Sequence, residues 1–150
     1  MKLYIASDHG GFKFKEKLKD YFNKTGVEYE DLSSYKEDNE DDYPDYAFKL
    51  GEKVIKEKNS RGILICGSGA GMVIAVNKVK GIRAALAYDA YSAKMAKIDN
   101  NANILCLRER QFNFSKAKKL VQIWLKAEFS ELSRHQRRIK KIERYENKRR

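Results

Sequence analysis

The sequence predicts an α/β fold built on a doubly wound parallel sheet. Short apolar runs alternate with longer amphipathic segments along the 150 residues, and repeated strand–helix units of this kind are typical of parallel sheets covered by helices on both faces. The run at residues 62–66 is continuously apolar after its first glycine, as expected of a strand that is buried on both faces. Because no linker, repeat or low-complexity segment divides the sequence, we expect one domain over residues 1–150.

The same patterns place the individual elements in order. Strands are expected at residues 2–6, 27–32, 62–66, 82–87 and 103–107, paired in the order 2-1-3-4-5. Helices are expected at residues 12–24, 45–58, 71–79, 90–97 and 114–127, followed by a terminal helix from about residue 131 whose part at 134–150 is basic. Pro44 suits the first turn of the second helix. The acidic run before it, residues 37–42, is interpreted as a solvated loop.

The composition argues against several kinds of partner and site, namely nucleic acid, membrane, disulfide and metal. The net charge of +11 is concentrated at residues 134–150, which hold nine Lys or Arg and two Glu. A basic tail on a nearly balanced body is typical of a solvated helix, so we expect no nucleic-acid partner. The sequence has no apolar run long enough for a signal or a membrane span. Two cysteines in different contexts form no disulfide framework and favour the reducing cytoplasm. The spacing of the His and Cys residues predicts no metal site.

Chemically active side chains are expected to meet at one edge of the sheet, because ligands of such folds bind beyond the carboxyl ends of the strands. Asp8 and His9 follow the first strand, Cys66 ends the third and Arg110 follows the fifth. The glycine-rich loop at residues 67–71 lets the backbone approach a ligand, and the following helix offers N–H groups to an anion. A loop of this kind also serves packing alone, and Asp8 could simply cap the next helix.

Cys66 is the candidate reactive centre. The N–H groups of the following helix would stabilise its thiolate, and a lowered pKa raises the reactivity of a cysteine. The alternative is a buried structural thiol, an interpretation that fits Cys106 in the middle of the fifth strand. Arg134 and Arg138 are four residues apart on one helical face, where two guanidinium groups suit a phosphate. The alternative for that pair is a solvated basic face.

Several separate motifs together resemble the ribose-5-phosphate isomerase B family, which includes the galactose-6-phosphate isomerase subunits. They lie at residues 7–12, 42–47, 63–71, 77–84, 91–93 and 134–138, in the family's order, and the likeness runs from near residue 3 to about residue 142. The resemblance implies an aldose–ketose isomerase of the non-oxidative pentose phosphate pathway. It implies that ribose 5-phosphate and ribulose 5-phosphate interconvert through a cis-enediol without a metal or an organic cofactor. It also implies a homodimer, or a pair of dimers, whose sites are shared between subunits.

The resemblance also assigns roles to residues. Cys66 would move the proton between C1 and C2, since residues 67–72 contain no carboxylate that could act as the base instead. The N–H groups of the loop would stabilise the enediolate. The loop residues are Gly67, Ser68, Gly69, Ala70 and Gly71, and the other expected substrate contacts are Asp8, His9, Tyr43, Asn100, Arg110, Arg134 and Arg138.

One position departs from the family's pattern. Asp99 stands where the family has the histidine that helps to open the furanose ring, so it is the second expected catalytic residue. A carboxylate accepts a proton from the anomeric hydroxyl, but near pH 7 it is a poor donor to the ring oxygen. Two alternatives therefore stay open: a hexose 6-phosphate isomerase that acts with a partner subunit, and a non-catalytic protein that binds phosphorylated sugars.

Overall fold

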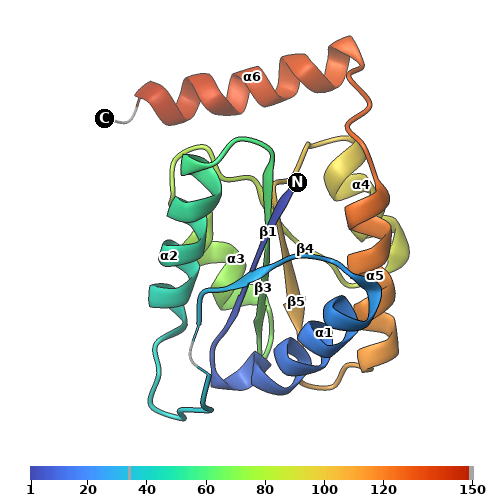
Figure 1. Ribbon diagram of the computed structural model, residues 1–150. Helices are drawn as coiled ribbons and strands as arrows, with labels where there is room; N and C mark the ends of the chain where they lie inside the picture. Colours follow the sequence, from blue (N-terminus) through green and yellow to red (C-terminus); the bar gives the residue numbers. More distant parts are fainter. Residues whose placement is uncertain (34, 149–150) are drawn as a thin grey trace.

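Five parallel strands form the centre of the protein in the computed structural model, which describes residues 1–33 and 35–148 (Figure 1). The strands are β1 (Lys2–Ser7), β2 (Glu30–Asp31), β3 (Ser60–Cys66), β4 (Ala84–Leu86) and β5 (Ile104–Arg108). The apolar runs that predicted β1, β3 and β5 are buried almost throughout. The predicted α/β class and the parallel sheet are confirmed.

The order of the strands is β2-β1-β3-β5-β4, so the predicted order 2-1-3-4-5 is wrong at one edge. β5 has four fully buried residues and pairs with both β3 and β4. β4 has only three residues, all partly exposed, which fits an edge strand. The chain therefore crosses from β3 to the edge strand β4, and β5 then lies between β3 and β4.

The helices cover the sheet on two faces (Figure 1). One face packs against α1, α4 and α5 through residues that include Leu18, Ala93 and Trp124. The other packs against α2 and α3 through residues that include Leu50 and Met72. Their bounds are α1 (Phe12–Thr25), α2 (Tyr43–Lys56), α3 (Ala70–Val76), α4 (Ala90–Ile98) and α5 (Phe114–Lys126), and a short 3₁₀ helix η1 (His9–Gly11) precedes α1.

The terminal helix α6 (Ser133–Lys148) crosses the molecule beyond the end of the sheet at which the strands begin (Figure 1). It buries only His135 and Ile139. The carboxylate of Glu146 accepts a hydrogen bond from the Gly81 N–H at 3.0 Å. The last two residues of the expected basic helix lie outside the described residues. Within the described chain, no helix combines the length and the apolar character that crossing a membrane requires.

Candidate active site

Cys66 lies at the carboxyl end of β3 with its thiol against the loop that follows. The Gly69 N–H donates a hydrogen bond to Cys66 Sγ at 3.0 Å. Gly69 has a φ of 78° and precedes the first turn of α3, a left-handed conformation that glycine adopts without strain. Cys66 is 4% exposed, so only a ligand seated on this loop can reach the sulfur.

Three other segments pack closely around the loop. A Cβ atom on Gly67 would lie 2.9 Å from the guanidinium of Arg110, so that side chain rests on the loop backbone. A Cβ atom on Gly71 would lie 2.9 Å from the ring of Tyr43, at the start of α2. One on Gly10, in η1, would lie 2.8 Å from the Gly67 nitrogen. The ends of β1, β3 and β5 and the start of α2 therefore form one surface, where the sequence predicted it.

His9 is held by a carboxylate that the sequence analysis did not assign to the site. Asp41 Oδ1 lies 2.6 Å from His9 Nδ1, and both carboxylate oxygens accept from the His9 backbone N–H. The hydrogen bond from Asp41 raises the pKa of His9, so the ring stays protonated to higher pH than a free imidazole. The interpretation of residues 37–42 as a purely solvated loop is wrong for Asp41, whose side chain is 7% exposed.

The Asp8 carboxylate is buried beside the same surface and does not cap the short helix η1. The side chain of Asp8 makes no capping hydrogen bond to η1, and its Oδ1 is buried without a partner. Burial raises the pKa of the Asp8 carboxyl, and the charge of Asp41 adds to the rise. Ligand atoms of Asp8, His9 and Asp41 lie within 4.8 Å of one another, a spacing that could hold a cation. The free oxygen suits a hydroxyl donor of a ligand equally well.

The described structure thus gathers Asp8, His9, Tyr43, Cys66, the loop residues 67–71 and Arg110; we call this group the thiol cluster. It does not bring the remaining predicted residues there. Those residues, which we call the arginine cluster, are Asp99, Asn100, Arg134 and Arg138. Asp99 is the C-cap of α4, and the two arginines lie on α6.

The two clusters lie at opposite ends of the sheet. β5 runs from Ile104, which is level with Ala84, to Arg108, which is level with Cys66. Those four steps span about 13 Å at the usual rise of a strand. Helix α6 lies beyond the amino end of that span (Figure 1), so one chain cannot place Arg134 or Arg138 on a small ligand at Cys66.

The arginine cluster is tied together by His135, which is buried beneath it. Arg134 Nε lies 3.2 Å from His135 Nε2, within hydrogen-bond distance. The other ring nitrogen, Nδ1, lies 2.7 Å from Ser130 Oγ and 3.7 Å from Asp99 Oδ1. Arg134 and Arg138 themselves are exposed, which leaves their guanidinium groups available to an anion.

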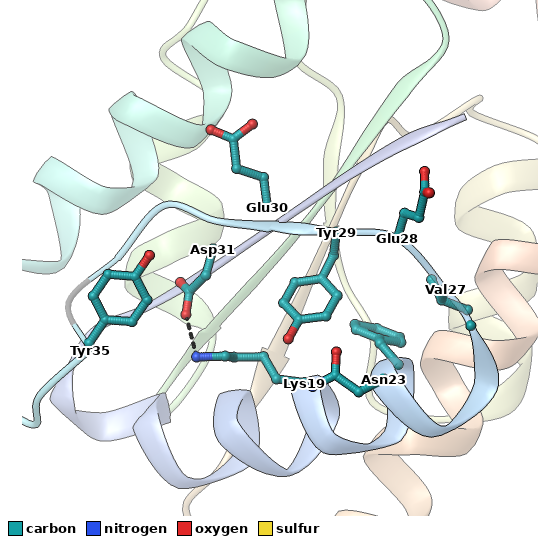
Figure 2. Close-up of a pocket in the computed structure, with 10 residues that line it drawn as sticks. Lys19, Asn23, Val27, Glu28, Tyr29, Glu30, Asp31 and Tyr35 are labelled. Carbon is teal, nitrogen blue, oxygen red and sulfur yellow. Dashed lines mark ion pairs between the residues drawn. The ribbon is translucent and has the colours of Figure 1, made fainter.

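A separate groove of about 890 Å³ lies between α1 and β2. Figure 2 shows Lys19 and Asp31 forming an ion pair within it, at 2.9 Å. Tyr29 and Tyr35 also line the groove, and it contains no member of either cluster. Because none of its lining residues belongs to the thiol cluster or the arginine cluster, the groove is not part of the candidate site.

Comparison with known proteins identifies relatives along almost the whole chain. The sequence profile of the Ribose/Galactose Isomerase family matches residues 3–142. The solved structure of ribose-5-phosphate isomerase B from Clostridium thermocellum is 44% identical, with 99% of each chain covered and a TM-score of 0.93. The structure of ribose-5-phosphate isomerase B from Mycoplasma genitalium with bound ribulose-5-phosphate is 44% identical, with 97% and 96% covered and a TM-score of 0.92.

One further relative acts on a shorter sugar, according to its name. D-erythrulose-4-phosphate isomerase 2 of Mycolicibacterium smegmatis is 38% identical over 97% of both proteins. The names of the relatives therefore differ in the length of the phosphorylated sugar.

Proposed function

Because the chain belongs to the ribose/galactose isomerase family, we propose that the protein interconverts ribose 5-phosphate and ribulose 5-phosphate. The observation that carries the proposal is the thiol of Cys66, which receives the Gly69 N–H at the end of a buried strand. The reaction moves one proton between adjacent carbons and needs a base rather than a redox cofactor. The relatives of 44% identity are ribose-5-phosphate isomerases B, one of them with ribulose-5-phosphate bound.

Cys66 is the base in this proposal. Its thiolate removes the proton from C2 of the open-chain aldose, and the electron pair of that C–H bond forms the enediolate double bond. The negative charge moves to the oxygen on C1, where N–H groups of the loop at residues 67–71 donate hydrogen bonds to it. The cysteine then returns the proton to C1, and the O2 hydroxyl passes its proton to the oxyanion on C1, so that C2 becomes the ketone and C1 carries a hydroxyl. Asp8, His9 and Tyr43 line the place of the sugar, and Arg110 faces it from the loop backbone.

A second copy of the chain completes the site. The thiol cluster has one arginine, Arg110, whereas Arg134 and Arg138 lie at the far end of the sheet. In a twofold dimer the arginine cluster of one chain meets the thiol cluster of its partner, so each dimer has two complete sites. Exposed apolar side chains beside the edge strand β4 support such a contact: Ile74, Tyr88 and Tyr91 are 62%, 64% and 71% exposed.

Asp99 and the arginines act on opposite ends of the substrate in this arrangement. Asp99 accepts the anomeric proton when the furanose ring opens, while Asn100 binds a sugar hydroxyl. Arg134 and Arg138 bind the phosphate together with Arg110, since forked guanidinium groups match its oxygens. We assign the enzyme to the cytoplasm, where sugar phosphates are metabolised and where the free thiols of Cys66 and Cys106 remain reduced.

The test is an isomerase assay on purified wild type, Cys66→Ala and the matched control Cys106→Ala. Both cysteines are buried and free, but burial, and then the neighbouring Cys66, raises the pKa of the Cys106 thiol, so Cys106 stays neutral. We expect Cys66→Ala to lower kcat by about a thousandfold or more, as for the loss of a general base. Cys106→Ala should keep kcat and lose about 1–2 kcal/mol of stability.

Activity of Cys66→Ala equal to that of Cys106→Ala would contradict the mechanism. A wild type that ignores pentose phosphates and converts galactose 6-phosphate would support the hexose alternative. A protein that binds ribose 5-phosphate and turns over no sugar phosphate would be a non-catalytic homologue.

A further inference from the structure

A single guanidinium group, that of Arg83, contacts both segments that carry the arginine cluster. Arg83 Nε donates to the carbonyl oxygens of Asn100 and Asn101 at 3.1 and 3.3 Å, and Nη2 donates to Asn101 at 3.2 Å. Its Nη1 lies 3.7 Å from the carboxylate of Glu143 on α6. All three nitrogen positions therefore have protein partners, and the group is directed into the chain rather than held out for a ligand.

The carbonyls that Arg83 binds belong to the turn that ends α4. Asn101 adopts a φ of 46°, and its N–H returns to Lys97 while the Ala102 N–H returns to Ala96. This left-handed ending leaves the last carbonyl oxygens pointing away from the helix, where a cation stabilises them. Asp99 and Asn100 lie within the turn, so the contacts of Arg83 fix the backbone that carries them.

The backbone around Arg83 is also fixed. The Arg83 N–H donates to Asn103 Oδ1 at 2.8 Å, and the Asn103 N–H donates to the Arg83 carbonyl at 3.1 Å. Asn103 Nδ2 donates to the Gly81 carbonyl at 3.0 Å. The Gly81 N–H in turn donates to Glu146 on α6. The segment at residues 81–83 is therefore a shared base for the end of α4 and for α6.

We propose that Arg83 is a positioning residue that sets the spacing between the sugar-binding and the phosphate-binding parts of the arginine cluster. Helix α6 buries only two residues, so its place depends strongly on these polar contacts. If the end of α4 and α6 shifted independently, Asp99 and the two arginines could not fit opposite ends of one substrate. The proposal rests on the isomerase function proposed above.

The test compares Arg83→Lys with Arg61→Lys as a matched control. Arg61 makes the same kind of contact at the end of α5, where its guanidinium binds the carbonyls of Trp124, Leu125 and Ala127. None of these carbonyls belongs to a residue with a proposed substrate contact. Lysine keeps the charge in both variants but loses the forked contact. We expect kcat/KM of Arg83→Lys to fall about 10- to 100-fold, the usual cost of a displacement near 1 Å, and that of Arg61→Lys to stay within about threefold of wild type.

A second variant removes only the contacts to α6. In Glu143→Ala/Glu146→Ala, the end of α4 keeps its Arg83 contacts while the phosphate-binding helix loses both carboxylates that anchor it. We expect KM for ribose 5-phosphate to rise about tenfold with kcat nearly unchanged, whereas Arg83→Lys lowers kcat as well. A residue that merely supported folding would lower the fraction of active protein and leave KM unchanged.

Wild-type kcat and KM in both Arg83→Lys and the double variant would overturn the proposal, as would equal losses in Arg83→Lys and Arg61→Lys. If Arg83→Lys does not fold, the KM of the double variant decides alone. A wild type without isomerase activity would overturn the proposed function itself, so the two failures are distinguishable.

Discussion

At the scale of single residues, the pair His9–Asp41 joins a side chain of the thiol cluster to a carboxylate outside it. The two side chains meet at 2.6 Å across 32 residues of sequence. The hydrogen bond raises the pKa of His9. The pair therefore stabilises the folded protein fully when the pH is below the pKa of a free imidazole. The contribution is lost as the pH rises through the folded pKa of His9.

We predict that Asp41→Asn lowers the pKa of His9, because an amide cannot pair with the imidazolium. NMR titration of the imidazole protons measures the change directly, and the only other histidine, His135, serves as the internal control. The stability difference between wild type and Asp41→Asn in urea should be larger at pH 6 than at pH 9. An unchanged His9 titration in the variant would show that Asp41 does not hold the ring in solution.

The residues that the structure brings together in the thiol cluster lie mostly at strand ends and helix starts, which local sequence patterns predict. Cys66 and its loop form a strand end and a helix start, and these follow from local pattern. Asp41 was missed because nothing local distinguishes it from the other acids of residues 37–42. Its position next to the motif at residues 42–47 was the available signal. Arg83 was missed as well, since its hydrogen bonds go to backbone carbonyls that no residue type reveals and its ion-pair partner Glu143 lies 60 residues away in the sequence.

At the scale of elements, helix α4 ends in an acidic residue at a position where basic residues are favoured. Carbonyl groups give the carboxyl end of a helix a partial negative charge, which favours cations there. The C-cap of α4 is the acidic Asp99. Basic groups compensate nearby: Arg83 binds the turn, and Lys97 donates to Asn101. Burial, and then the charges of Arg61 and Arg83, lowers the pKa of Lys97 to about 8.

We predict that Asp99→His raises kcat for ribose 5-phosphate by about tenfold or more at pH 7. An imidazole both accepts and donates a proton near neutral pH, whereas a carboxylate is better suited to accepting a proton than to donating one to the ring oxygen. The assay is steady-state isomerisation of ribose 5-phosphate. The control is erythrose 4-phosphate, which cannot close a furanose ring because its O4 carries the phosphate. Equal gains on both substrates, or none on either, would show that Asp99 does not limit ring opening.

The elements themselves followed from the sequence to different degrees. Helices with a clear apolar stripe, such as α1 and α5, begin at the predicted first residue and end within one residue of the predicted last one. The expected strand at residues 27–32 is reduced to the two residues of β2, because only Tyr4 and Ile5 of β1 pair with it. The order of β4 and β5 depends on which strand buries more surface across the whole sheet, and a strand-by-strand pattern does not contain that comparison.

At the scale of the whole molecule, a parallel α/β fold separates its functional groups by the direction of the chain. Residues that follow strands, such as His9 and Cys66, gather at the carboxyl edge, and residues that follow helices, such as Asp99, gather at the opposite edge. The order of the motifs along the sequence does not show that these two sets of residues lie at opposite edges of the sheet. The alternation of strands and helices does imply that separation, and so it supports a site that two chains share.

The shared site makes a specific prediction for mixed dimers. Cys66→Ala and Arg138→Ala should each be inactive alone, because every site in either homodimer lacks one essential group. In a heterodimer of the two variants, the intact thiol cluster of one chain meets the intact arginine cluster of the other. The second site combines both defects, so a heterodimer isolated through two different tags should show about half of the wild-type kcat per dimer. If each chain instead formed its own complete site, the heterodimer would be as inactive as its parents, and the separation of the two clusters would need a different explanation.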